Sequence, residues 1–376
     1  MTDRIRDFFA CTPHDRAVLV MDLDRVRENY EGFARSFPDT RIYYAIKANP
    51  APEVLSLLAD LGSCFDAASV PEIEMALAAG ATPDRIAFSN TIKKERDIAR
   101  AWRLGVRQYA FDSDAELEKL ARSAPGSRAV CRLLCDGEGA EWPLSRKFGC
   151  VPQMAEQLME RAQGLGLIAY GLQFHVGSQQ ADTSTWDRAL ETCAGIFRRL
   201  GERGIHLRMV NMGGGFPARY LRDVPGVPTY GQAIFGAMRR HFGNRLPETV
   251  IEPGRGMVGD AGIIRSEVVL ISRKDADDPV RWVYLDIGKF GGLAETMDEA
   301  IRYPIRTAHD HGAVEPSILA GPTCDSVDVM YEKTPVMLPV ALEIGETVLI
   351  ESAGAYTTTY AANGFNGFAP LQCVCI

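Results

Sequence analysis

The chain lacks both a leader-like start and a membrane-spanning run. Its opening residues, MTDRIRDFFACTPHDR, are charged throughout, with no apolar stretch before a small-residue cleavage site. No segment approaches the roughly 18 consecutive apolar residues of a transmembrane helix. Long blocks of Lys and Arg are also missing, and the 376 residues carry a formal net charge of -8, which argues against a nucleic-acid or membrane-surface partner. We therefore expect a cytoplasmic protein whose partner is a small molecule.

Signals for paired cysteines are absent as well. The nine cysteines are an odd number, and no two have C-x-x-C spacing, so the sequence indicates neither a disulfide framework nor a structural zinc site. Apolar residues are abundant, at 46% of the chain. This content can fill two domain cores, or one large barrel with an appended domain.

A short β-rich run, a turn and a helical stretch recur eight times between about residue 42 and residue 255. The intervening segments, such as PEVLSLLADLG and VPEIEMALAAG, have helical spacing and end in glycine. Eight such units within roughly 200 to 250 residues predict a (β/α)8 barrel, of the TIM type, rather than an open sheet. The β-rich runs are IYYAIKAN, SCFDAAS, RIAFSN, RQYAFDS, RAVCRLL, IAYGLQFHVGS, RMVNMGGGF and ETVIEPGR.

The pattern changes after residue 260. Alternating runs such as IIRSEVVLIS, VRWVYLDIG, PVMLPVALEIGETVLIESAGAY and LQCVCI predict a mostly antiparallel β domain, a sandwich or small barrel. The first twenty or so residues include RAVLVMD and are expected to add a strand to it. We accordingly predict a barrel over residues 23–258 and a β domain built from residues 1–22 and 259–376.

Polar residues close the predicted barrel strands, and in such a barrel the strand ends face one another where chemistry gathers. Four of these features also have a plain structural interpretation. The lysine could be a solvated surface charge, the histidine a core residue, the glycine run a tight turn, and the glutamate a salt-bridge partner of the nearby arginine. The set comprises Lys47, Asp66, Asn90, Asp112, Arg132, His175 with Ser178, Gly213, Gly214 and Gly215, and Glu252 with Arg255.

Together these residues supply the parts of a pyridoxal phosphate site. A lysine at the end of a buried strand can attach a carbonyl cofactor through its amine. Consecutive glycine amides and an arginine can hold a phosphate. A histidine can lie flat against a ring, and a carboxylate can pair with the ring nitrogen. No single part is specific, but their joint occurrence in order on barrel strands predicts this cofactor.

Seven motifs resemble, in the same order, those of the fold-type III pyridoxal-phosphate amino acid decarboxylases, and within them the ornithine decarboxylase branch. The resemblance extends from about residue 18 to the C-terminus. It implies an alanine-racemase-like barrel with a β domain, and pyridoxal 5'-phosphate as the cofactor. The motifs are YYAIKANP, FDAAS, FHVGSQ, NMGGGFP, EPGR, GPTCDSVD and GAYTTTYAANGFNGF.

The resemblance also implies a role for each matching residue. Lys47 would hold the cofactor covalently, Glu252 would pair with the pyridine nitrogen, and His175 would stack on the ring. Asp66 and Arg132 would line the cofactor near Lys47. The remaining cofactor contacts, chiefly to the phosphate, would come from Ser178, Gly213, Gly214, Gly215, Gly254, Arg255 and Tyr356.

The GPTCDSVD segment matches one that, in the family, reaches across a dimer interface into the neighbouring active site. Cys324 would protonate the substrate carbon after carbon dioxide leaves, and Asp325 would bind the distal ammonium of a diamino acid. Lys147 and Asp328 match a pair that forms a salt bridge between subunits. The resemblance thus implies a homodimer with shared active sites. Without it, Cys324 would be interpreted as a buried thiol in a loop.

The segment ETMDEAIRYP adds Asp298 and Glu299 as further acidic candidates for a basic substrate, although acidic residues also favour helix starts. Glu299 stands where animal-type ornithine decarboxylases carry aspartate, and Phe290 where they carry tyrosine. Because one methylene changes discrimination by only ~1 to 3 kcal/mol, ornithine and lysine could both be substrates. The leading hypothesis is decarboxylation of L-ornithine to putrescine for polyamine biosynthesis, ahead of a bifunctional lysine/ornithine enzyme that also makes cadaverine.

Other activities of this fold are less favoured. An arginine decarboxylase remains an alternative. A diaminopimelate decarboxylase is disfavoured because Asp325 would repel a second distal carboxylate. A racemase of the same fold uses a catalytic tyrosine and an arginine at the pyridine nitrogen, where this chain has Glu252. A catalytically inactive homologue that only binds partner proteins is disfavoured by the presence of Lys47, Glu252, the glycine run and Cys324.

Overall fold

The computed structural model describes residues 2–142 and 147–376 of the chain. These residues form two compact units, each described here by itself. The barrel unit comprises Arg27–Pro217 and Val224–Met257, and the β unit comprises Met1–Val26, Ala218–Asp223 and Val258–Ile376. Among the described residues, no helix has both the length and the apolar character needed to cross a bilayer.

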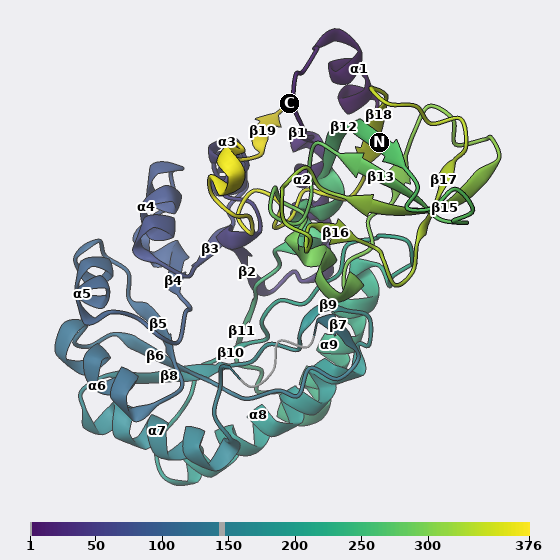
Figure 1. The fold of residues 1–376 in the computed structure, drawn as a ribbon. Helices are drawn as coiled ribbons and strands as arrows, with labels where there is room; N and C mark the ends of the chain where they lie inside the picture. Colours follow the sequence, from purple (N-terminus) through teal and green to yellow (C-terminus); the bar gives the residue numbers. More distant parts are fainter. Residues whose placement is uncertain (1, 143–146) are drawn as a thin grey trace. The chain divides into compact units, whose positions relative to one another are not determined.

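Eight parallel strands close into a barrel, and they coincide with the eight β-rich runs of the sequence (Figure 1). Their spatial order is β10, β11, β2, β3, β4, β5, β6, β8, and β8 pairs with β10 to complete the ring. The predicted (β/α)8 barrel is therefore confirmed. The strands are β2 (Thr40–Ala45), β3 (Cys64–Ala67), β4 (Ile86–Phe88), β5 (Gln108–Phe111), β6 (Arg128–Arg132), β8 (Ile168–Gln173), β10 (Met209–Asn211) and β11 (Glu248–Ile251).

Helices follow the strands and surround the barrel on its outside (Figure 1). They are α2 (Leu23–Ser36), α3 (Pro52–Asp60), α4 (Val70–Ala78), α5 (Glu95–Arg103), α6 (Asp114–Ser123), α7 (Pro152–Gly164), α8 (Ser184–Glu202), α9 (Val227–Phe242) and the short α10 (Arg255–Val258).

The barrel interior is packed with side chains rather than open. One buried cluster takes a single residue from each of seven strands, which ties the ring together below its mouth. The polar end of Tyr170 in this layer donates a hydrogen bond to Glu248 at 2.6 Å, which satisfies its hydroxyl group. The members are Tyr43, Cys64, Ala87, Val130, Tyr170, Met209 and Val250.

The start of α4 shows how local sequence fixes a strand end at the mouth. Ser69 caps the helix, and its hydroxyl group accepts a hydrogen bond from the backbone N–H of Glu72 at 3.4 Å. The Glu72 carboxylate reaches back to the backbone N–H of Ala68 at 2.6 Å. This arrangement is close to a capping box, and it holds the residues between β3 and α4 in place.

The run IAYGLQFHVGS is not one strand in the structure. It divides into β8 and β9 (Ser178–Gln180), and β9 pairs with β7 (Ala140–Trp142) in a small antiparallel sheet. Gly177 between them has φ +96°, a left-handed conformation that ends strand geometry. The chain therefore turns between His175 and Ser178, and the sequence did not indicate this sheet.

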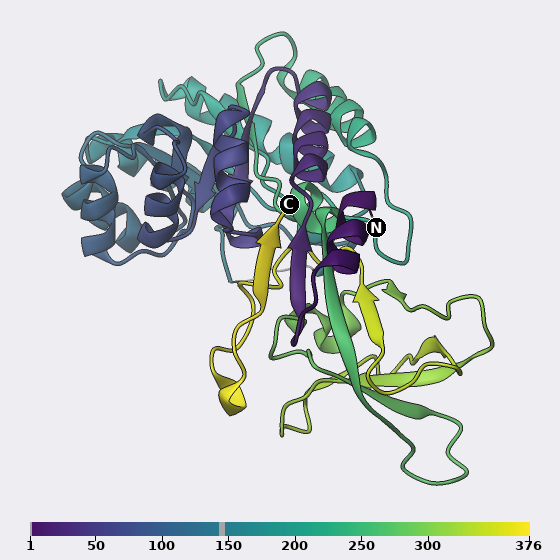
Figure 2. The same ribbon diagram turned by 90° about the horizontal axis from the view of Figure 1, so that it is seen from above.

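The β unit contains a mostly antiparallel sheet, as predicted. The N-terminal strand β1 (Val18–Met21) pairs with both β12 and β19, antiparallel to the first and parallel to the second (Figure 2). The other strands are β12 (Gly262–Ser272), β13 (Arg281–Leu285), β14 (Ile305–Arg306), β15 (Val314–Ala320), β16 (Val329–Met330), β17 (Val336–Pro339), β18 (Thr347–Ile350) and β19 (Gln372–Cys375).

Two elements of the β unit were not foreseen. Helix α1 (Asp3–Cys11) begins at Thr2, whose side chain caps it, and Ile5 of α1 packs with Val18, Val20 and Ile263. Strand β15 is not among the alternating runs named from the sequence, and it contains Pro316, which cannot donate a ladder hydrogen bond. In the structure β15 nevertheless pairs with β13, β16 and β17.

Candidate active site

A cavity of about 370 Å³ lies where several barrel strands end. It brings together five of the predicted cofactor residues, all of which follow different strands. It also contains Asn90, which the strand-end pattern had singled out, and Lys147, which had been assigned to a dimer interface. The lining residues are Lys47, Asp66, Ala68, Ser89, Asn90, Arg132, Lys147, Phe148, Gln173, His175 and Glu252.

Lys47 is an exposed residue within a buried stretch. It lies in the single turn Ile46–Ala48 that follows β2, with buried residues on both sides. The hydroxyl of buried Tyr44 donates to the carbonyl of Asn49 at 2.8 Å, and the Asn49 side chain accepts from the N–H of Ala51 at 3.0 Å. These bonds fix the Asn49–Pro50 turn, so that Lys47 is held at the cavity while its neighbours remain in the barrel wall.

Glu252 is buried at the end of β11 and is held by three side chains. Its Oε1 accepts hydrogen bonds from Asn211 Nδ2 at 2.5 Å and from Ser89 Oγ at 3.3 Å. From the part of the chain that the structure describes, its Oε2 accepts one side-chain bond, a long one from Gln173 Nε2 at 3.4 Å. Sequence reasoning missed these three donors, although each lies at or just after a barrel strand. Because Oε1 accepts two hydrogen bonds and Oε2 accepts one long bond, Oε2 is the oxygen better placed to accept from a ring N–H.

Burial, and after it the nearby Asp66 carboxylate, raises the pKa of Glu252 to about 8. The hydrogen bond from Asn211 and the positive charges of Lys47 and Arg132 act in the opposite direction. An ionised carboxylate in this position therefore gains much from an additional positive partner. A protonated pyridine nitrogen has the charge and the N–H that this position requires.

His175 is a neutral, oriented ring. Burial, followed by the positive charges of Arg132 and Lys47, lowers its pKa to about 3. Its Nδ1 accepts a hydrogen bond from the N–H of Gly177 at 3.0 Å, so the proton lies on Nε2. A neutral imidazole can lie flat against a protonated pyridine ring without charge repulsion.

The glycine run has a structural explanation of its own. A Cβ at Gly213 would lie 2.2 Å from the Phe174 carbonyl, one at Gly214 would lie 2.5 Å from the Glu252 carbonyl, and one at Gly215 would meet Gly177. Gly213 and Gly215 also have positive φ, at +65° and +97°. Close backbone approach therefore accounts for the glycines before any ligand is considered, as the plain alternative suggested.

The same loops also assemble a donor set that suits a phosphate. Arg255 Nη2 donates to Ser178 Oγ at 3.1 Å, and the N–H of Gln180 donates to the carbonyl of Gly215 at 2.9 Å. Gly254, before Arg255, accepts from the N–H of Met257 at 3.0 Å and closes the turn of α10. An arginine, a hydroxyl and a glycine backbone without side chains are thus adjacent, and this chemistry fits a phosphate dianion.

The loop after β6 contributes a second wall of the cavity. The Arg132 guanidinium lies 5.2 Å from the centre of the Phe148 ring, and Lys147 Nζ lies 4.9 Å from the same ring. Asp112, another strand-end candidate, does not line the cavity. Its Oδ2 instead accepts the N–H of Gly149 at 2.8 Å and holds this loop.

The other predicted residues belong to the β unit. Cys324 is exposed, and its backbone N–H donates to the side-chain oxygen of Asn366 at 2.8 Å, a support that sequence reasoning missed. The Asp325 carboxylate accepts the N–H of Val327 at 2.9 Å, which orders the same loop. The predicted residues of this unit are Phe290, Asp298, Glu299, Cys324, Asp325, Asp328 and Tyr356, and their substrate, cofactor and interface roles stay predictions.

Two acidic residues of the β unit are already engaged within it. Asp328 is buried, and its carboxylate accepts the N–H of Lys289 and the hydroxyl of Thr323, each at 2.7 Å. Glu299 forms an ion pair with Arg302 at 2.6 Å and accepts backbone N–H groups of the 333–334 turn. The Asp298 side chain is 87% exposed, and its partner is the exposed Lys333, whose Nζ lies 3.4 Å from Asp298 Oδ1.

Comparison with known proteins places this geometry in a family. Residues 23–259 match the model of the pyridoxal-dependent decarboxylase family that describes its pyridoxal binding domain. The lysine/ornithine decarboxylase of Selenomonas ruminantium is 36% identical over 93% of this chain and 87% of its own length. The antizyme inhibitor 2 of Xenopus laevis is 32% identical over 94% of this chain and 79% of its own.

Solved structures agree with the sequence comparison. The lysine/ornithine decarboxylase of Vibrio vulnificus, solved with cadaverine, has a TM-score of 0.88 and 30% identity, covering 99% of this chain and 97% of its own. The arginine decarboxylase of Paramecium bursaria Chlorella virus, bound to agmatine, has a TM-score of 0.90 and 28% identity, with full coverage of both chains. The chain therefore belongs to the pyridoxal-dependent decarboxylases, and pyridoxal phosphate is its cofactor.

Proposed function

We propose that the protein decarboxylates L-ornithine to putrescine in polyamine biosynthesis, and that it also accepts lysine, giving cadaverine. The observation that carries the proposal is the cavity that joins Lys47 to a buried Glu252 with one oxygen weakly occupied. Similar proteins named for lysine and ornithine, at up to 36% identity, support the basic amino acid as the substrate class. An arginine decarboxylase is the remaining candidate, because a structure of that activity is equally similar in fold.

Glu252 has the central electrostatic role. Pyridoxal phosphate, when bound, supplies a conjugated ring that accepts the electron pair left behind when carbon dioxide departs. Glu252 would hold a proton at the ring nitrogen, and its other oxygen is already oriented by Asn211 and Ser89. The residue can therefore act without rearranging, because its orientation is fixed before the substrate arrives.

Lys47 and His175 position the reacting groups. Lys47 Nζ would attach the cofactor and yield that position to the substrate amine. The neutral His175 ring, with Nδ1 bound to Gly177, would cover one face of the cofactor and exclude water from it. Ser178 and Arg255 would hold the phosphate, so that the cofactor stays in register when the bond to Lys47 is exchanged.

Cys324 is proposed to return a proton to the substrate carbon after carbon dioxide leaves. The exposed thiol and its Asn366-supported backbone fit a residue presented outward from the β unit. We propose that the active unit is a homodimer, in which this loop serves the neighbouring subunit's site. Lys147 and Asp328 are the proposed pair between the subunits.

Chain-length preference is proposed to depend on Asp325 and Asp298. Glu299 already receives an Arg302 guanidinium and two backbone N–H groups, so binding a substrate ammonium there would compete with three donors. Asp298 is the exposed acid of the pair. Because one methylene is worth only ~1 to 3 kcal/mol, we expect measurable turnover of lysine beside ornithine.

The substrate assignment predicts an order of rates. With ornithine, lysine, arginine and diaminopimelate supplied separately to the holoenzyme, ornithine should release carbon dioxide fastest, with lysine second. Chiral analysis of the remaining amino acid should show no inversion, which separates decarboxylation from racemisation. A lysine or arginine rate well above the ornithine rate would reverse the assignment. Absence of any release, with cofactor bound, would favour an inactive homologue.

The proton-donor assignment predicts a change of product. Cys324→Ala should lower the rate by roughly 10²-fold, the lower range for loss of a general acid, and raise the share of transamination product. Amine and aldehyde products can be separated by chromatography. Cys11→Ala is the matched control, since Cys11 is also exposed but lies in α1. An unchanged rate and product ratio in Cys324→Ala would remove the residue from this role.

A further inference from the structure

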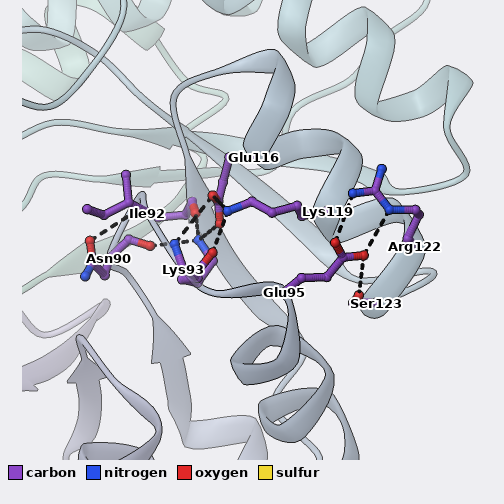
Figure 3. A network of polar contacts seen from close by, with 9 residues as sticks. Asn90, Ile92, Lys93, Glu95, Glu116, Lys119, Arg122 and Ser123 are labelled. Atoms are coloured by element: carbon purple, nitrogen blue, oxygen red, sulfur yellow. Dashed lines mark hydrogen bonds and ion pairs between the residues drawn. The ribbon is translucent and has the colours of Figure 1, made fainter.

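Lys93 is a buried charge next to the cavity that the mechanism above does not use. Its side chain has no exposed surface, and it lies three residues after Asn90 in the loop that follows β4. Its Nζ donates to the carbonyl oxygens of Asn90 at 2.7 Å and Ala110 at 2.6 Å. Its third neighbour is Glu116 Oε1 at 3.0 Å. The ammonium group thus donates two hydrogen bonds to backbone carbonyls and forms an ion pair with Glu116, and Figure 3 draws Lys93 with Asn90 and Glu116.

Glu116 completes the network from helix α6. Its side chain is only 3% exposed, and its Oε2 pairs with Lys119 Nζ at 2.5 Å and accepts the Lys93 backbone N–H at 3.4 Å. Farther along the same helix, Arg122 and Ser123 bind Glu95 of α5 (Figure 3). The network thus joins the loop after β4 to β5 and α6.

Burying the Lys93–Glu116 pair costs free energy, so a gain in stability does not explain why the pair is there. Burial lowers the pKa of Lys93 to about 8, and the Glu116 carboxylate opposes that change. Buried ion pairs are often no more stabilising than well-packed apolar residues of similar volume. The contribution of this pair is geometric, because an ammonium group that donates to two backbone carbonyls holds both of them in one arrangement.

One acceptor of Lys93, Asn90, belongs to the wall of the cofactor cavity. Asn90 lines the cavity, and the adjacent Ser89 donates its hydroxyl to Glu252 Oε1 at 3.3 Å. On the other side, this turn is tied to the end of β3, since Ser89 N–H donates to Ala67 at 3.0 Å and Asn90 Nδ2 to Ala68 at 3.3 Å. Lys93 is therefore the anchor of the Ser89–Asn90 turn on its β5 side.

We propose that Lys93, held by Glu116, is a positioning residue of the active site. Its ammonium fixes the Ser89–Asn90 turn so that the Ser89 hydroxyl orients the carboxylate that faces the cofactor ring. The proposal rests on the cofactor site described above and not on the choice of substrate. Lys93 does not contact the cofactor cavity itself. It holds Asn90, and the adjacent Ser89 donates the hydrogen bond that orients Glu252.

Lys93→Met tests this proposal, because methionine can fill the buried volume but donates no hydrogen bond. We expect pyridoxal phosphate to bind about 10- to 100-fold more weakly, by analogy with the loss of metal affinity when a residue that orients a metal ligand is removed. The absorbance maximum of the bound cofactor should also shift, since the ring nitrogen's partner is reoriented. Dilution of the full-length holoenzyme, followed by absorbance, measures both quantities without any substrate.

The adjacent lysine offers a matched control. Lys94 is exposed, so Lys94→Met makes the same substitution one residue away and should leave cofactor affinity and absorbance unchanged. Ser89→Ala should reproduce the direction of the Lys93→Met shift. In a double-mutant cycle, the losses of cofactor affinity in Lys93→Met and Ser89→Ala should be less than additive. Both substitutions weaken the same interaction, the hydrogen bond from Ser89 to Glu252.

Several outcomes would overturn the proposal. A folded Lys93→Met protein with wild-type cofactor affinity and absorbance is one, and fully additive effects with Ser89→Ala are another. If Lys93→Met does not fold, Glu116→Gln and Ser89→Ala decide, and unchanged cofactor affinity in both would count against it. Carbon dioxide release with ornithine is scored separately, so a wrong substrate does not affect the result.

Discussion

Lys47→Ala and Lys47→Arg are expected to abolish covalent retention of pyridoxal phosphate and to reduce decarboxylation by several orders of magnitude. Alanine removes the amine, whereas arginine keeps the positive charge on a group that remains protonated and does not act as a nucleophile. Loss of activity in both variants would therefore identify the amine, rather than the charge near Glu252, as the necessary feature.

The attachment site can be measured directly. Borohydride reduction of the holoenzyme, followed by peptide mass analysis, should place the cofactor mass on the peptide that contains Lys47. Lys147 lines the same cavity and Lys93 is bonded to Asn90 of its wall, so the peptides of both lysines are examined as well. Lys94→Ala, at an exposed position, is the control and should keep the full label. Cofactor mass on Lys93 or Lys147 would refute the assignment of Lys47.

The barrel could be predicted because its information is local and periodic. Each strand is a short apolar run followed by a turn and a helix, and each of the eight runs became a barrel strand. Knowing that strand ends meet at one mouth was then enough to bring together Lys47, Asp66, Arg132, His175 and Glu252. Their shared cavity follows from topology and needs no knowledge of side-chain contacts.

The supporting contacts could not be predicted, because they join residues that are distant in sequence. Ser89 and Glu252 are 163 positions apart, and Lys93 and Ala110 are 17 apart, with no motif that marks either pair. A buried lysine also looks like a surface lysine in the sequence: Lys93 and Lys94 are adjacent, yet only Lys93 is buried. Burial, which gives Lys93 its role, is a property of the folded chain alone.

Two acidic residues of the β unit look alike in the sequence but differ in their surroundings in the structure. Asp298 and Glu299 are equivalent candidates in the sequence, since both are carboxylates in one segment. Both have positive φ, at +53° and +61°, which is uncommon for residues other than glycine. This backbone turns the Glu299 carboxylate onto Arg302 and leaves Asp298 exposed. The backbone conformation therefore separates a largely buried carboxylate, paired with Arg302, from an exposed one, paired with Lys333.

Glu252→Gln is expected to lower kcat/KM by on the order of 10²- to 10³-fold, the usual effect of losing one pre-oriented electrostatic partner. Glutamine keeps the shape and can still accept from Asn211, but it provides no negative charge for the ring nitrogen. Glu248→Gln is the matched control, because Glu248 lies at the opposite end of the same strand and is exposed. Equal losses in the two variants would contradict a specific role for Glu252.

The same substitution should change how stability depends on pH. In the cofactor-free protein the pKa of Glu252 is raised to about 8, chiefly by burial and then by Asp66. A raised carboxyl pKa means that the folded state holds the proton more tightly than the unfolded state. Its contribution to the free energy of unfolding is therefore complete below the ordinary pKa of about 4.3 and is lost as pH rises through about 8.

Thermal unfolding of the cofactor-free protein measures this loss. The range from about pH 4 to about pH 9 covers both the ordinary pKa of Glu252 and its raised pKa in the folded state. The stability of Glu252→Gln relative to the parent should increase across that window, because glutamine has no proton to lose. With pyridoxal phosphate bound, the positive ring nitrogen would favour the ionised carboxylate, so the pH dependence of the difference should shrink. A stability difference independent of pH in the cofactor-free pair would show that Glu252 is ionised without a partner, and would weaken the argument that this site is built for a cationic ring.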